Sequence, residues 1–231
     1  MLPALPLLRV SVTLHSMMTV GRAQLKEFRN TLASEARAYQ ANISVEEIER
    51  LSEYYNLLNA WNARLHLVAP CPPREFAIRH VLESLILLPH LPQGAKVADI
   101  GSGAGLPIIP CLIARPDIRA TLIESSKKKA VFLREALNRA GALKSATVIA
   151  ERFEKIPAPE SDFITCRALD RFEAKLPALL EWSPPSSTLL FFGGEGLRDQ
   201  IANMNLSFSE IHIPNSKRRF LFVIRGTRDI R

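Results

Sequence analysis

Residues 97–110 read VADIGSGAGLPIIP, a short apolar run that is closed by Asp99 and followed by three glycines within five positions. Glycine adopts positive φ without strain and lets a bound molecule approach the main chain closely. We call residues 101–106 the glycine turn. A tight strand-to-helix turn needs only one glycine, so three of them favour a ligand-binding turn over a purely structural one.

The spacing of the glycines narrows the class of ligand. A dinucleotide fingerprint, GxGxxG, needs its third glycine where this chain has Leu106, and a P-loop needs a Lys followed by Ser or Thr, which GSGAGLPIIP lacks. The next apolar run ends at Glu124, about twenty residues on, where a carboxylate accepts hydrogen bonds from both ribose hydroxyls. The alternative for Glu124 is an acid that stabilises a helix N-terminus. We therefore predict an adenosine-containing ligand, held by Gly101, Gly103, Gly105 and Glu124.

The chain around this turn alternates short apolar runs with amphipathic stretches, which predicts an α/β fold with a mostly parallel sheet. The last two of the apolar runs are joined only by residues 214–217, so they predict an antiparallel end to that sheet. Seven runs read as strands: KVADI (96–100), RATLIES (119–125), SATVIAE (145–151), SDFITCR (161–167), STLLFFG (187–193), LSFSEIHI (206–213) and RRFLFVIRG (218–226).

Ahead of these strands the pattern is different. Residues 1–18 are apolar but too interrupted by proline and arginine for a membrane span, and we expect a disordered leader. Residues 19–92 repeat their apolar positions at helical spacing, and Ser44 with Glu47 forms a capping box. We expect a helical extension over 19–92 that packs as one globular unit with an α/β domain over 93–231.

Net charge and cysteine content limit the partners, metal sites and cellular location that we expect. Lys plus Arg number 30 against 23 for Asp plus Glu, which gives a net charge of +7 and favours a polyanionic partner such as nucleic acid. The three cysteines form no CxxC pair, so we expect no metal site and a reducing, cytoplasmic location. Lys127, Lys128 and Lys129 begin a predicted helix against its dipole, and either RNA phosphate or a solvated face explains them.

Several segments together resemble one family. The glycine turn, the acid in LIES and the following KKKAVFLREAL resemble S-adenosylmethionine-dependent methyltransferases of the Rossmann-like class. More narrowly, the chain resembles the small-subunit ribosomal RNA guanine-N7 methyltransferases, also called glucose-inhibited division protein B, over residues 45–196. The segments that agree in order are LLNAWN (57–62), RHVLES (79–84), DIGSGAGLPIIP (99–110), ARPD (114–117), SSKKKAVFLREAL (125–137), ERFE (151–154) and CRA (166–168).

This resemblance implies a class I methyltransferase fold, with seven strands of which the last is antiparallel. It implies S-adenosylmethionine as cofactor and ribosomal RNA or the small subunit as partner. We expect the protein to act as a monomer. The implied cofactor contacts are Gly101, Leu106, Phe153, Glu154 and Arg167, with Glu124 at the ribose.

Two interpretations remain open for each of three residues. Arg167 positions guanine or cofactor, or it forms an ion pair with a helix acid. Arg79 and His80 in RHVLES reach the same cleft and contact RNA, or they belong to a helix surface. We name no catalytic acid or base, because guanine N7 carries no proton that must be removed.

The sequence departs from the family pattern at four places: His66, Ile108, Cys166 and Gly193 stand where the family usually has asparagine, glycine, serine and lysine. These departures bear more on RNA positioning than on cofactor binding. The alternatives to an rRNA methyltransferase are a methyltransferase for another RNA, a protein or a small molecule, and a non-catalytic RNA-binding protein with the same fold.

Overall fold

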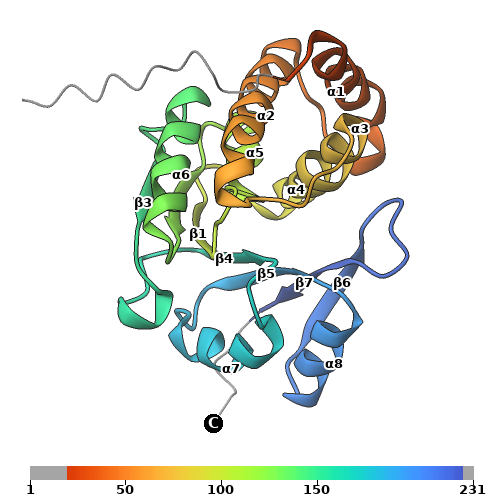
Figure 1. The fold of residues 1–231 in the computed structure, drawn as a ribbon. Helices are drawn as coiled ribbons and strands as arrows, with labels where there is room; N and C mark the ends of the chain where they lie inside the picture. The colour runs from red at the N-terminus through yellow and green to blue at the C-terminus, as the bar shows by residue number, and fades with distance from the viewer. Residues whose placement is uncertain (1–19, 226–231) are drawn as a thin grey trace, which may run out of the picture.

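The computed structural model describes residues 20–225, so the leader predicted over residues 1–18 lies outside the described residues. The first part of the described chain is helical, as predicted (Figure 1). Its helices are α1 (Arg22–Glu35), η2 (Ala36–Tyr39), α2 (Val45–Leu65), α3 (Pro73–Phe76), η3 (Ala77–Leu82), α4 (Glu83–Leu85) and η4 (Leu88–His90). We call residues 20–92 the helical extension.

Local sequence signals explain where these helices begin. Glu47 donates its backbone N–H to Ser44 Oγ at 3.2 Å, and Glu47 Oε2 accepts from the Ser44 N–H at 2.7 Å, which confirms the capping box of α2. Pro73 is the first residue of α3, where its missing N–H costs no hydrogen bond. The following segment η3 is a π-helix, which no pattern in the sequence predicts.

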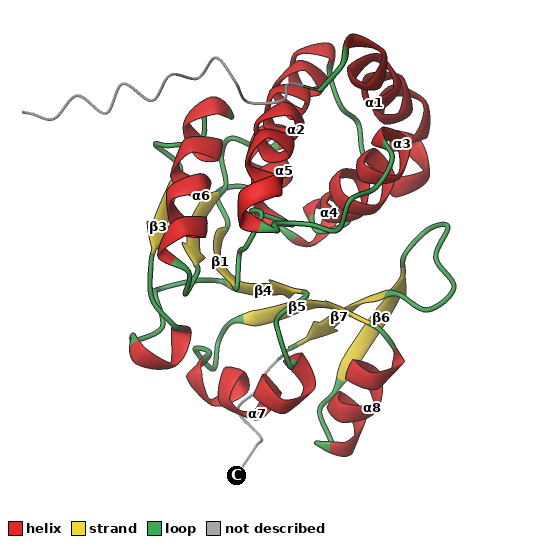
Figure 2. Ribbon diagram, in the orientation of Figure 1, coloured by secondary structure: helices red, strands yellow, loops and turns green. Residues whose placement is uncertain are grey.

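The remaining chain forms the predicted seven-stranded sheet (Figure 2). The strand order is β3-β2-β1-β4-β5-β7-β6; strands β1 to β5 pair in parallel, and β7 runs antiparallel to both neighbours. The antiparallel end is therefore confirmed. The strands are β1 (Lys96–Ile100), β2 (Arg119–Ile123), β3 (Ala146–Ile149), β4 (Phe163–Arg167), β5 (Thr188–Gly193), β6 (Phe208–His212) and β7 (Phe220–Ile224).

Helices cover both faces of the sheet, and each face has its own buried cluster. One face packs against α5 (Ile108–Ala114), α6 (Lys127–Arg139) and the helical extension, and the other packs against η5 (Phe153–Lys155), α7 (Phe172–Trp182) and α8 (Glu195–Asn203) (Figure 2). Gly141 follows α6 at φ +68°, as expected for a helix C-terminus.

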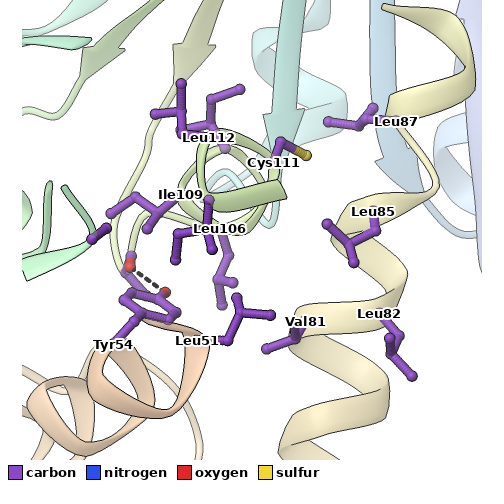
Figure 3. Close-up of a cluster of buried hydrophobic side chains, with 14 of the residues drawn as sticks. Leu51, Tyr54, Val81, Leu82, Leu85, Leu87, Leu106, Ile109, Cys111 and Leu112 are labelled. Atoms are coloured by element: carbon purple, nitrogen blue, oxygen red, sulfur yellow. Dashed lines mark hydrogen bonds between the residues drawn. The ribbon is translucent and has the colours of Figure 1, made fainter. Parts of the chain in front are cut away.

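The helical extension shares its core with the sheet. Leu51 and Tyr54 from α2 and Val81 from η3 face Leu106, the last residue of the glycine turn, and Ile109 in α5, and all five are buried (Figure 3). Burying side chains of this size contributes roughly 1.5–3 kcal/mol each. The extension is thus packed directly behind the glycine turn. Between residues 20 and 225, no helix is both long and apolar enough to cross a membrane.

Candidate functional site

A cleft of about 660 Å³ lies at the carboxyl ends of β1, β2 and β4. Its walls come from residues 67–69, much of the glycine turn, and residues 123–125, 151–154 and 167–171. The strand order reverses between β1 and β4, and open parallel sheets place their ligands at such a switch point. The cleft therefore lies where the fold favours binding.

The three glycines of the turn have different surroundings, although all have positive φ: +69° at Gly101, +49° at Gly103 and +83° at Gly105. A Cβ on Gly103 would have only the Gly101 carbonyl oxygen nearby, at 3.6 Å, so its main chain is open to the cleft. A Cβ on Gly105 would lie 2.3 Å from Ile109 Cδ1, inside the core. Gly105, grouped with the binding glycines by sequence, does not line the cleft.

Glu124 lies at the end of β2 on the wall of the cleft and is 7% exposed. One carboxylate oxygen accepts the Gly103 N–H at 2.9 Å and the other accepts the Ser126 N–H at 2.7 Å, at the start of α6. The two interpretations of Glu124 therefore do not exclude each other. Each carboxylate oxygen has a second lone pair with which it can accept from a ligand.

Asp99 in β1, two positions before Gly101, does not line the cleft, but it is a buried acid next to the glycine turn that sequence reasoning did not single out. Its side chain is fully buried, and neither carboxylate oxygen has a hydrogen-bond partner among the described residues. Burial, with the nearby charge of Glu124, raises the pKa of Asp99 to about 7. The sequence signal that could have indicated Asp99 is an acid near the end of an otherwise apolar strand.

Arg167 extends from the end of β4 into the wall of the cleft, with a side chain that is 14% exposed. Its Nη2 lies 3.0 Å from Glu83 Oε2, Nη1 donates to Ser84 Oγ at 3.4 Å, and the guanidinium lies 5.4 Å from the centre of the Phe192 ring. Arg167 thus lines the cleft and forms an ion pair with a helix acid at the same time.

Of the RHVLES segment only His80, one of the two residues singled out from sequence, lines the cleft. Glu83 and Ser84, its last two residues, hold Arg167. His80 does line the cleft, and burial and neighbouring arginines lower its pKa to about 3, so it is uncharged at neutral pH. The Arg79 side chain is half exposed, pairs with Glu75 and does not line the cleft.

The remaining predicted residues divide between the cleft and its surroundings. Phe153 and Glu154 line the cleft, and the buried Phe153 ring packs edge-on against Trp182 at 5.6 Å. Of the three lysines at the start of α6, only Lys129 lines the cleft. No group of histidines, cysteines and acids suited to a metal ion occurs within residues 20–225.

Two of the four family departures lie in fully buried positions. His66 ends α2 at φ +47°, and the Asn62 side chain exchanges two hydrogen bonds of 3.0 Å with the Val68 backbone, closing the loop that lines the cleft. Ile108 and Cys166 are fully buried. These two departures therefore change the core rather than the cleft surface.

Comparisons with known proteins agree with this geometry. The family model described as rRNA small subunit methyltransferase G matches residues 47–219. A relative named ribosomal RNA small subunit methyltransferase G, from Xanthomonas campestris pv. campestris (strain B100), is 40% identical over 153 residues, or 66% of this chain and 71% of the relative. A relative with the same name from Gluconobacter oxydans (strain 621H) is 37% identical over 174 residues, or 74% of this chain and 86% of the relative.

Among solved structures, a ribosomal protein L11 methylase from Lactobacillus delbrueckii subsp. bulgaricus superposes with a TM-score of 0.53 at 13% identity. The superposition covers 64% of this chain and 79% of that protein. At this identity the likeness shows a shared fold alone.

Proposed function

The chain belongs to the rRNA small subunit methyltransferase G family, and from this premise we propose that it methylates N7 of a guanine in small-subunit ribosomal RNA with S-adenosylmethionine as donor. The chain is an rRNA methyltransferase by family. The donor, the guanine N7 position and the residue roles are the proposed part. The observation that supports them best is the cleft, where the open main chain of Gly103 meets the carboxylate of Glu124.

The residues of the cleft fit S-adenosylmethionine. The main chain from Gly101 to Gly103 leaves room that any Cβ at Gly103 would enter, which suits the methionine end of the donor. Glu124 would accept hydrogen bonds from the ribose hydroxyls of the donor, and Phe153 and Glu154 would contact its adenine base.

The methyl transfer requires little from the protein beyond orienting the donor and the guanine. When bound, the donor supplies a methyl group on a positively charged sulfur. Guanine N7 offers a lone pair and has no proton to lose, so no side chain needs to act as general base. His80 is uncharged at neutral pH and so adds no positive charge that would oppose the donor. Arg167 would hold the donor or the guanine at the wall of the cleft.

Basic residues around the cleft support an RNA substrate. Lys129, Arg152, Arg171 and Lys175 all line it, and the whole chain has a net charge of +7. Phosphate contacts from such residues position RNA without reading its sequence. Since ribosomal RNA is the substrate, we place the enzyme in the cytoplasm.

The test is methyl transfer with mapping of the product. The protein is incubated with radiolabelled S-adenosylmethionine and small ribosomal subunits, naked small-subunit RNA or transfer RNA. We expect label in small-subunit RNA, and borohydride-aniline cleavage at one guanine, which marks N7 methylation. Label without cleavage would contradict the N7 assignment. Donor binding without label in any RNA would favour the non-catalytic RNA-binding protein.

A further inference from the structure

Glu83 is a buried carboxylate placed between two arginines from distant parts of the chain. Its side chain is 1% exposed. Oε2 lies 3.0 Å from Arg167 Nη2 and accepts from Arg219 Nη1 at 3.3 Å, and Oε1 lies 2.8 Å from Arg219 Nη2. The carboxylate therefore joins the helical extension, the end of β4 and the segment that leads into β7.

The position of the Arg167 guanidinium depends on the helical extension. Within the described chain, its three polar contacts are the Glu83 carboxylate, the Ser84 hydroxyl and the carbonyl oxygen of Arg79. All three come from one helical segment. On the sheet side it meets the ring of Phe192, which attracts the charge but fixes no rotamer as a bidentate contact does.

We propose that Glu83 is a positioning residue that fixes Arg167 at the wall of the cleft, with Arg219 as the second cation that keeps the carboxylate in place. This inference rests on the proposed function and narrows it, because of the two ligands open for Arg167, the donor and the guanine, it assigns the donor. Removing one partner from a buried ion pair leaves the others without compensation, so the Arg167 side chain would leave its position when the Glu83 charge is lost.

A double-mutant cycle tests whether Glu83 acts through Arg167. The affinity for S-adenosylhomocysteine is measured by calorimetry, without RNA, for wild type, Glu83→Gln, Arg167→Met and the double variant. We expect Glu83→Gln to weaken binding about tenfold, the effect of losing one charge-assisted contact. In the Arg167→Met background the same change should alter affinity by less than about twofold.

The matched control is Glu75→Gln, which breaks the exposed pair with Arg79 in the same helical segment and should leave affinity unchanged. Equal losses from Glu83→Gln in both backgrounds would overturn the inference, since they would indicate a general packing effect. An unchanged affinity of Glu83→Gln would also overturn it. If thermal unfolding shows that Glu83→Gln does not fold, Glu83→Asp and Arg219→Lys are put through the same cycle and judged by the same criterion.

Binding by the wild type distinguishes a failure of this inference from a failure of the proposed function on which it rests. A wild-type chain that fails to bind S-adenosylhomocysteine would overturn the proposed function and the inference together. A wild type that binds, with additive losses in the cycle, would overturn the inference alone.

Discussion

At the scale of single residues, the glycine turn combines two requirements that one sequence pattern does not separate. Gly103 keeps a path open to the cleft, whereas Gly105 lets Ile109 and Leu133 pack where a side chain would stand. A glycine count therefore predicts the turn correctly, but it does not say which glycine faces the cleft. Only the packing of α5 and α6 against the turn distinguishes them.

Gly103→Asp should abolish binding of S-adenosylhomocysteine, because it places a side chain and a negative charge where the ligand approaches the main chain. Gly141→Asp is the control: its φ is +68°, similar strain is imposed, and nothing lies within 4 Å of the added Cβ. Calorimetry should show binding by the control and none by Gly103→Asp. Equal affinities would remove the turn from the site.

Asp99 predicts a pH dependence of stability. Its pKa is raised to about 7 from an ordinary value of 3.8, so between these values the folded state keeps a proton that the unfolded state has lost. The unfolding free energy should then fall as pH rises through this window, by at most about 1.4 kcal/mol per pH unit.

His80 contributes the opposite slope below its ordinary pKa of 6.5, so the quantity to compare is the difference between wild type and Asp99→Asn. Urea unfolding from pH 4 to pH 7 should show wild type losing stability relative to the variant as pH rises. A difference that stays constant with pH would mean that Asp99 is ionised throughout.

At the scale of elements, helix α2 supports the glycine turn from behind. The fully buried Tyr54 hydroxyl donates to the Ala104 carbonyl oxygen at 2.7 Å (Figure 3). The start of α2 was predictable from its capping box and its apolar spacing. Its contact with the turn was not, because a tyrosine in an apolar stripe predicts burial and not the partner of its hydroxyl.

Tyr54→Phe should lower the unfolding free energy by about 1–3 kcal/mol, since it leaves a buried carbonyl without a donor. We also expect weaker binding of S-adenosylhomocysteine, because Ala104 lies within the turn. Tyr39→Phe removes a partly buried hydroxyl bond to Pro214 and should cost less stability and leave binding unchanged. Denaturant unfolding and calorimetry of both variants check this, and the reverse order would contradict it.

At the scale of the whole molecule, the sequence predicts architecture better than it predicts contacts between distant segments. Alternating strands and helices predict the parallel sheet, and the short link between β6 and β7 predicts its antiparallel end. Glu83, in contrast, is an ordinary acid within a helical pattern. Its burial between Arg167 and Arg219 arises only when residues more than eighty positions apart are brought together.

RNA binding should depend on the charge around the cleft. If the lysines at the start of α6 contact phosphate, replacing Lys127, Lys128 and Lys129 by alanine should lower the slope of log K against log salt by about 0.7–0.9 per lost contact. The Lys129→Ala change alone should give part of this decrease in slope, since Lys129 lines the cleft. Lys144→Ala, an exposed lysine just before β3, is the control. Filter binding over a salt series gives the slopes, and an unaltered slope would make the three lysines a solvated face.

The most direct measurement of the central claim is a crystal structure of this chain with S-adenosylhomocysteine. We predict the ribose hydroxyls within hydrogen-bond distance of Glu124 and the methionine end along Gly101 to Gly103. A ligand bound elsewhere on the chain, or held in the cleft without contact to Glu124 and the glycine turn, would contradict this account.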